Sequence, residues 1–244
     1  MEIGEGQAKA FTVLEFTFSH SNDWTKMTKP IRSSFLSLIG VQVGEDYNYE
    51  CVLAKWEDRR RQLEDFFERE VRAGHIYEVE RIVKLWTNLW LVSFLGPGER
   101  TVRRTVVGPR SVSWSSRISK GLQHWQVTLR DGDVEEILDK LNSFGRIREL
   151  NLRRVYLRSK PRGLWFNSTN PLKFILTERE LEVLRVAHRE GMFNKSRAVN
   201  IDGLAKLLNR NKSTVDREIR AALSKVINLY MNLGDEDAEF NEAS

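Results

Sequence analysis

The sequence predicts an α+β module followed by an all-α helix-turn-helix domain. Two observations predict it: segments with strand and helix periodicity alternate through residues 1–158, and only helical periodicity follows residue 176. The 244 residues, of which 41% are hydrophobic, suffice for two domains. We expect an α+β module at 1–158, a basic linker at 159–175, a helix-turn-helix domain at 176–233 and an acidic disordered tail at 234–244.

The first half of the module begins with a strand at 11–18, which is rich in aromatic and β-branched residues. Pro30 then predicts a short helix with Ile31, Phe35, Leu38 and Ile39 on one face, ended by Gly40. The remaining predicted elements are a strand at 49–56, an amphipathic helix at 58–73, and two tightly joined strands at 76–85 and 88–95.

The second half repeats this order. We predict a strand at 101–107, a Gly-, Pro- and Ser-rich passage, a strand at 124–130, a helix at 133–144 and a strand at 146–157. Residues 131–133 supply a turn and an N-cap for that helix. The recurrence predicts two ferredoxin-like or ACT-like units packed as one module, and it leaves the strand order open.

Periodicity stops at 159–173, where Pro161, Gly163 and Pro171 interrupt the chain. Trp165 and Phe166 predict that this linker docks on a domain, because a free linker rarely carries both.

A tri-helical pattern follows the linker. Thr177 and Glu180 have the spacing of a capping box and open a helix that extends to about Arg189 and stops near Gly191. A second helix is predicted at 201–208, where the small Ala205 permits close packing, and Asn209 suits a left-handed turn. Ser213 is expected to cap a third helix.

The apolar stripe of the third helix leaves its polar residues for DNA. Arg217 and Arg220 are three residues apart and share a face, so they are the expected base readers. The full set of candidate DNA-binding residues is Arg210, Asn211, Lys212, Ser213, Thr214, Asp216, Arg217 and Arg220.

Residues 176–231 resemble the helix-turn-helix of archaeal bacterio-opsin-activator (Bat-type) transcription regulators. The resemblance rests on the segment from Leu176 to Leu184, the loop with Gly191 and Phe193, and the run from Leu204-Ala205 through Ser213-Thr214-Val215 to Ile219. It implies a module whose third helix enters the major groove. Two positions depart from the pattern: Asn209 replaces a turn glycine, and Arg210 replaces a buried aliphatic residue, so that Arg210 is expected to face phosphate.

Basic residues are also concentrated just before this motif. The net charge is only +5, but residues 146–173 hold eight basic side chains and one carboxylate. Arg153, Arg154, Arg158, Lys160 and Arg162 are candidate contacts to the DNA backbone, which would add salt-dependent affinity. A solvated strand face explains them equally well.

Composition argues against several other classes of protein. The single cysteine, Cys51, lies in an apolar run and is expected to be buried, and the four histidines lack metal-ligand spacing. We therefore expect no metal, no cofactor and no catalytic residues. His20 with Asp23 fits either a ligand pocket or, better, a polar turn. We find no secretory signal or membrane span and expect a cytoplasmic protein.

The sequence thus predicts a sequence-specific regulator of transcription that binds double-stranded DNA. We expect a homodimer, because one recognition helix contacts few base pairs. A further expectation is that a small-molecule effector binds the N-terminal module and changes the affinity for DNA. The alternatives are an enzyme-like or sensor module whose helix-turn-helix contacts proteins, and an RNA-binding protein with Trp125 and Tyr156 exposed on its strands.

Overall fold

The computed structural model describes residues 9–43, 46–58, 61–107, 111–130, 134–157, 170–196 and 198–234. These residues form two compact units. The N-terminal module comprises residues 1–84 and 88–170, and the C-terminal unit comprises residues 85–87 and 171–244. Most of the predicted linker, the turn at 131–133 and the acidic tail from 235 onward lie outside the described residues. The α+β module followed by a helical domain is confirmed.

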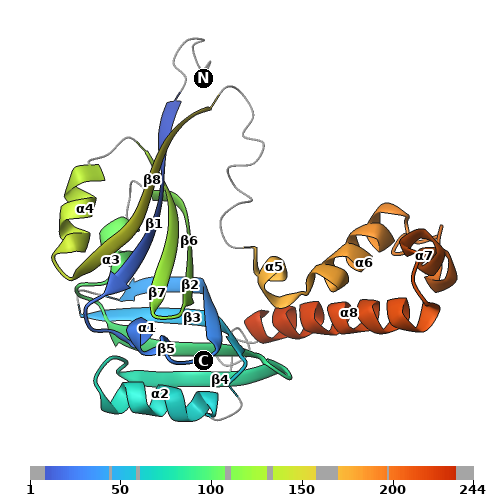
Figure 1. Ribbon diagram of the computed structural model, residues 1–244, viewed down its shortest axis with the longest axis horizontal. Helices are drawn as coiled ribbons and strands as arrows, with labels where there is room; N and C mark the ends of the chain where they lie inside the picture. The colour runs from blue at the N-terminus through green and yellow to red at the C-terminus, as the bar shows by residue number, and fades with distance from the viewer. Residues whose placement is uncertain are drawn as a thin grey trace, which may run out of the picture. The chain divides into compact units, whose positions relative to one another are not determined.

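The described residues of the N-terminal module form one antiparallel sheet of eight strands and four helices (Figure 1). In chain order the elements are β1 (Lys9–His20), α1 (Trp24–Met27), β2 (Ser33–Val43), β3 (Tyr47–Trp56), α2 (Leu63–Arg72), β4 (Glu78–Trp86), β5 (Leu89–Pro97), α3 (Val102–Val106), β6 (Ser111–Ser119), β7 (Leu122–Arg130), α4 (Val134–Asn142) and β8 (Gly145–Leu157). The order β-α-β-β-α-β therefore occurs twice.

The order of strands in the sheet is β4-β5-β3-β2-β6-β7-β1-β8. Strand β1 thus lies among the strands of the second half, between β7 and β8, and β5 lies among those of the first half, between β4 and β3. The first strand of each half therefore pairs with strands of the other half, so that β1 and β5 are exchanged. The two halves join edge to edge where β2 pairs with β6 through Phe35 and Ile118.

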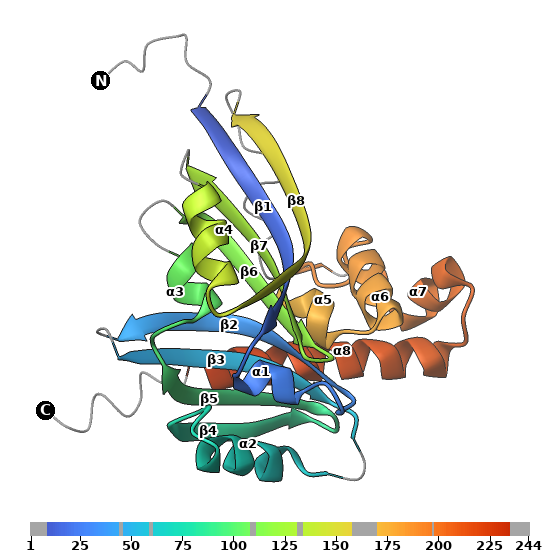
Figure 2. The same ribbon diagram turned by 60° about the vertical axis from the view of Figure 1, so that its left-hand side comes forward.

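Each half has its own core on the side of the sheet that carries helices (Figure 2). In one core Trp24 of α1 packs edge-on against Phe35 and Phe94, with Phe66 and Phe67 of α2 beside them. The second core joins β1, β7, α3 and α4 through Leu14, Val102, Val127 and Leu141. Consequently α1 belongs to the first core and α3 to the second, although the strands that precede them belong to the opposite halves.

Two predicted elements in this module are wrong. Most of the segment predicted as a helix at 30–40 belongs to the strand β2, which starts at Ser33 and pairs with β3 along its length and with β6. Phe35, Leu36 and Ser37 are all buried, so both faces of this strand are covered. Its apolar residues therefore do not alternate, and the sequence alone did not distinguish it from a helix.

The segment at 101–107 is the helix α3 and not a strand. The hydroxyl of Thr101 accepts a hydrogen bond from the backbone N–H of Arg104 at 3.1 Å, and Val102 and Val106, one turn apart, are both buried. Strand β6 and helix α1 were not predicted. Strand β6 is rich in serine, which has little strand propensity, and its pairing with β7 and β2 determines its conformation.

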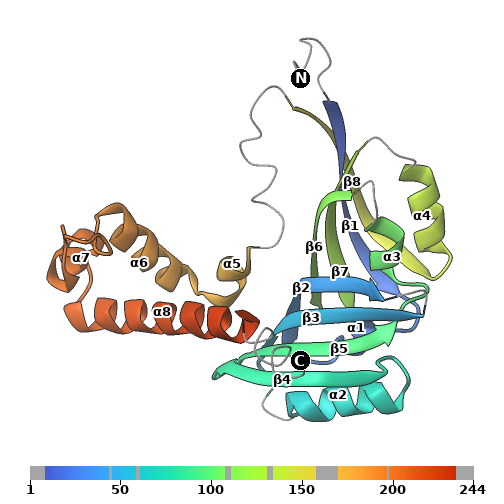
Figure 3. The same cartoon turned by 180° about the vertical axis from the view of Figure 1, so that it is seen from behind.

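The C-terminal unit is helical, with α5 (Pro171–Ile175), α6 (Glu178–Arg189), α7 (Ile201–Leu208) and α8 (Lys212–Gly234). Figure 3 shows α6 and α7 beside the first turns of the long α8. Helix α5 lies in the segment that was predicted as linker. Within the described residues, no helix combines the length and apolar character that a membrane crossing requires.

Candidate nucleic-acid interface

The start of α6 carries the predicted capping box. The backbone N–H of Glu180 donates to the Thr177 hydroxyl at 3.2 Å, and the Thr177 N–H donates to the Glu180 carboxylate at 2.8 Å. The same carboxylate accepts two hydrogen bonds from Lys225 of α8, each 2.8 Å long. Burial raises the pKa of Glu180, but the hydrogen bonds from Lys225 and Thr177 outweigh burial and leave the pKa below its ordinary value.

The turn between α7 and α8 is tight. Asn209 adopts the left-handed conformation with φ 51° and ψ 47°, which confirms the role predicted for it. The N–H of Arg210 then donates to the carbonyl of Ala205 at 3.0 Å and closes the end of α7. Leu204 and Ala205 are buried with Val215 and Ile219 of α8, so α7 and α8 form a closely packed pair.

Helix α8 begins at Lys212, two residues before the start that a cap at Ser213 requires. The carbonyl of Asn211 accepts from the N–H groups of Thr214 and Val215 at 3.0 and 3.1 Å. Asn211 therefore precedes the first turn, and Ser213 lies within that turn with an exposed side chain. The assignment of Ser213 as the cap was wrong, because Asn211 occupies that place.

Arg217 and Arg220 are both exposed on α8, outside its apolar stripe. Arg220 donates from Nε to Asp216 at 2.9 Å while its side chain stays 76% exposed. The guanidinium of Arg217 has no hydrogen-bond or ion-pair partner within the part of the chain that the structure describes. Its donors are therefore available to an external partner.

Arg210, unlike Arg217, forms ion pairs within the domain. Its guanidinium donates to Glu182 of α6 and, at 3.1 Å, to Glu218 of α8, and only 24% of its side chain is exposed. The hydrogen bond to Glu182 is the main reason why the pKa of Arg210 is raised. The polar bridge explains how an arginine fills a position where an aliphatic residue was expected.

Lys212 forms a further bridge, from the start of α8 to Asp202 in the first turn of α7, at 3.0 Å. Both side chains are more than half exposed, so water competes for this ion pair.

A concavity of about 650 Å³ lies over the turn between α7 and α8. Besides Arg210, Asn211 and Thr214 it is lined by Arg179 and Lys206, which the sequence reasoning did not select. Arg179 belongs to α6 and Lys206 to α7, whereas the DNA-binding residues predicted from the sequence lie at the turn and on the third helix. The basic side chains of Arg179 and Lys206 are the feature of the sequence that could have identified them.

The predicted basic contacts near 146–173 are only partly described. Arg153 and Arg154 are exposed on the edge strand β8, where they pair in register with Val13 and Thr12. Successive strand residues point to opposite faces, so these two arginines do not share one surface. Arg153 also lies 3.7 Å from Glu15. Arg158, Lys160 and Arg162 lie outside the described residues, and backbone contact by this group stays a prediction.

Trp125 does not meet the requirement for stacking on RNA bases, because it is 5% exposed and belongs to the second core. The side chain of Tyr156 lies outside the described residues. Cys51 is buried as expected, at 1% exposure. Among the described residues, no three His, Cys, Asp or Glu side chains are grouped to hold a metal ion.

Comparison with known proteins gives a match in the C-terminal unit. Residues 176–228 match a family model described as an HTH DNA-binding domain, of the bacterio-opsin-activator type. The match covers α6, α7 and the first part of α8, the elements whose geometry is given above. A search of curated proteins finds no match. The C-terminal unit therefore contains a helix-turn-helix DNA-binding domain, which supports a DNA-binding transcription regulator.

Proposed function

We propose that the protein recognises specific sequences of double-stranded DNA by placing the first turns of α8 in the major groove. The guanidinium of Arg217 carries this proposal, because it is exposed and has no partner among the residues that the structure describes. An arginine fork at such a position suits the acceptor pair of a guanine edge. Arg220, one turn further on, extends the same face, and its bond to Asp216 fixes Nε.

The start of α8 supplies contacts of a different kind. Asn211, Lys212 and Ser213 are exposed there, next to backbone N–H groups at a helix N-terminus. Such groups bind phosphate and set the orientation of a helix in the groove without reading bases. Arg179 and Lys206 in the neighbouring concavity extend this positive surface. We assign Arg210 a structural role, because its fork is occupied by Glu182 and Glu218.

A homodimer forms part of the proposal. Ile227, Tyr230 and Met231 are 56%, 77% and 54% exposed on α8. Their spacing of three and four residues places them on one face of the helix, which suits contact with a second copy. Sedimentation of the full chain would test this: a monomer at micromolar concentration contradicts it, and a dimer that Tyr230→Ser and Met231→Ser together dissociate supports it.

The decisive test of DNA recognition uses duplexes that the full-length protein selects from a random pool. Arg217→Ala should weaken binding to the selected duplex about 10- to 100-fold and relax preference at one base position. Arg189→Ala is the matched control, because it removes an exposed arginine of α6 outside the α7–α8 surface. Recovery of no consensus sequence, or equal losses for the two variants, would contradict the proposal.

We propose further that a small molecule acting on the N-terminal module alters DNA affinity. A cavity of that module, lined by charged side chains as well as aromatic ones, supports this input.

A further inference from the structure

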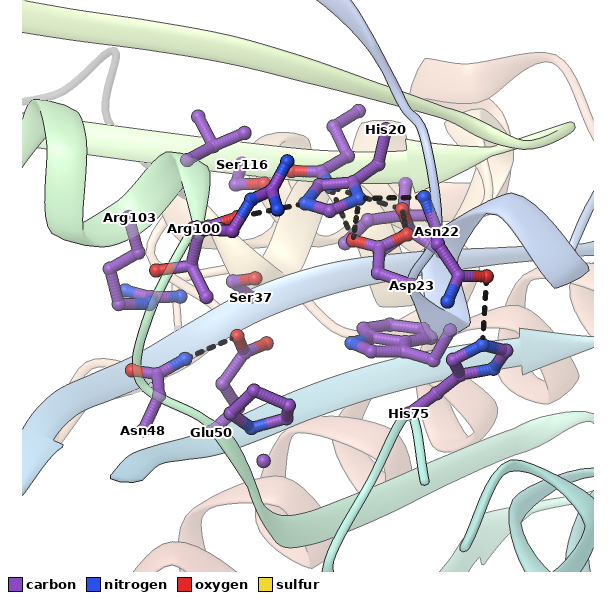
Figure 4. A pocket seen from close by; sticks show the side chains of 18 of the residues that line it. His20, Asn22, Asp23, Ser37, Asn48, Glu50, His75, Arg100, Arg103 and Ser116 are labelled. Carbon is purple, nitrogen blue, oxygen red and sulfur yellow. Dashed lines mark hydrogen bonds and ion pairs between the residues drawn. The ribbon is translucent and has the colours of Figure 1, made fainter. Parts of the chain in front are cut away.

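A cavity of about 340 Å³ lies inside the N-terminal module, where its two halves meet (Figure 4). Two of its walls are the segments 20–25 and 96–103, which follow β1 and β5. Because β1 and β5 are exchanged, each segment has to cross from one half to the other to reach α1 or α3. The crossing segments thus meet at one place, and the volume there suits a small metabolite.

One side of the cavity is made of polar groups that already have partners. Asp23 accepts from the Thr25 hydroxyl at 2.6 Å and from the side-chain amide of Gln123 at 3.0 Å. His20 lies with Nε2 2.9 Å from the carbonyl of Arg100 and accepts at Nδ1 from the N–H of Asn22. His20 and Asp23 lie in a polar turn at the end of β1, as expected, and both line this cavity, whereas a ligand at these two residues stays a prediction.

The other side holds polar groups without partners, and Figure 4 shows them together. Arg103 is 4% exposed, and its Nε and Nη1 atoms have no hydrogen-bond partner among the described residues. The same holds for Oδ1 of Asn48 and the hydroxyl of Ser116. Unsatisfied buried groups are rare and costly, and four such atoms around one cavity favour a polar ligand at this place.

The position of Arg103 is tightly constrained. Its guanidinium carbon lies 4.3 Å from the centre of the Trp114 ring. On β2, a Cβ atom at Gly40 would lie 1.9 Å from the same carbon. The sequence therefore keeps glycine where this guanidinium has to fit. The charge is costly in this place, since burial lowers the pKa of Arg103 despite the nearby charge of Glu50.

Glu50 and Asn48 lie next to Arg103. The Asn48 amide donates to Glu50 at 2.7 Å, so Oδ1 of Asn48 and the Glu50 carboxylate present acceptors. Burial raises the pKa of Glu50, an effect that the positive charge of Arg103 opposes. In the described structure no ion pair within 4 Å joins Glu50 to Arg103, so each side chain lacks a close counter-charge.

The charges around the cavity select the class of ligand. Three carboxylates (Asp23, Glu50 and Glu99) and two guanidinium groups (Arg100 and Arg103) line it. The carboxylates disfavour a phosphate dianion. A molecule with both an anionic and a cationic group satisfies the open donors and the open acceptors together. Trp24, Phe94 and Trp125 add an apolar wall for a side chain.

We infer that this cavity binds a zwitterionic amino acid, with its carboxylate on Arg103 and its ammonium on Glu50 and Asn48. The inference names the chemical class of the proposed effector. An effect of this amino acid on DNA affinity rests on the proposed function, whereas its binding to the cavity does not.

The test begins with the full-length protein and the twenty common L-amino acids, each at about 1 mM, monitored by thermal shift and tryptophan fluorescence. At least one should raise the melting temperature and alter the fluorescence of Trp24 or Trp125. For the best binder, the matched amine that lacks the carboxylate and the matched acid that lacks the ammonium should each bind about 10- to 100-fold more weakly, by calorimetry. Binding by inorganic phosphate alone, or by no amino acid, would overturn the inference.

Variants then locate the site. Gly40→Ala should displace the guanidinium and reduce affinity about 10- to 100-fold, and Arg103→Met should do the same. Arg104→Met is the matched control on the exposed side of α3 and should bind as the wild type does. Glu50→Gln keeps the shape and should weaken the amino acid more than its acid analogue. Circular dichroism shows whether each variant folds, and unchanged binding by folded Gly40→Ala and Glu50→Gln would refute the assignment.

A DNA-binding measurement with and without the amino acid separates the two claims. A ligand that binds at Arg103 but leaves DNA affinity unchanged would retain the site and disprove the proposed effector input.

Discussion

Both carboxylate oxygens of Glu180 lie 2.8 Å from the Nζ atom of Lys225, and each side chain is 9% exposed. The same carboxylate accepts the backbone N–H of Thr177. One acidic residue therefore closes the first turn of α6 and attaches that turn to the middle of α8, which carries the proposed DNA-reading residues on its earlier turns.

Replacing one partner of this pair should be destabilising. Lys225→Met leaves a buried carboxylate without its counter-charge, and we expect a loss of about 3 kcal/mol in the free energy of unfolding of the C-terminal unit. Urea unfolding followed by circular dichroism would measure it. Arg189→Met, which removes an exposed pair with Glu190, should cost less than about 1 kcal/mol. Equal losses for the two variants would contradict the prediction.

Acid should weaken the same pair. The pKa of Glu180 is lower in the folded chain than its ordinary value of 4.5, so the unfolded chain binds the proton more readily. The stabilisation is therefore complete above about pH 4.5 and is lost as the pH falls below that value. The difference in unfolding free energy between wild type and Glu180→Gln should shrink between about pH 6 and about pH 3; a constant difference would argue against an ionised Glu180.

Asn209→Gly should stabilise the turn between α7 and α8. Asn209 has φ 51°, a conformation that glycine adopts without the steric cost of a Cβ atom. We expect a gain of up to about 1 kcal/mol, whereas Asn209→Val should lose more than that. Thermal unfolding of the full chain gives both values, and a valine variant as stable as the wild type would show that the turn adopts another conformation in solution.

Arg210→Met distinguishes a structural arginine from one that contacts DNA. Loss of the bridge to Glu182 and Glu218 should reduce the unfolding free energy by about 1 kcal/mol. The salt dependence of DNA binding should stay as it is, because no phosphate contact is removed. A shallower salt slope with unchanged stability would instead support the original expectation that Arg210 faces phosphate.

The C-terminal unit was the most predictable part of the fold, and the reason is local. Thr177, Asn209 and the stripe through Val215 and Ile219 act within one helix or one turn, so their roles are visible at short sequence distance. The hydrogen bond from Arg210 to Glu182 was not predictable, because Glu182 lies 28 residues away in the sequence.

The N-terminal module was harder to predict because its strands depend on distant partners. Strand β6 contains five serines in nine residues, and its conformation comes from pairing with β7 and β2. The cavity was missed for the same reason: Arg103, Asn48 and Gly40 lie on three elements that were not predicted to meet, and Arg103 lies in a segment mistaken for a strand.

The exchange of β1 and β5 has a consequence for how the chain folds. Neither half forms its complete sheet from its own sequence, because β1 pairs only with β7 and β8 of the second half. Thr17, for example, pairs with His124 and Glu149, which lie more than a hundred residues later in the chain. Such long loop closures slow folding. They also make one half by itself an incomplete fold, so a cut between β4 and β5 should yield two fragments that acquire structure only when mixed.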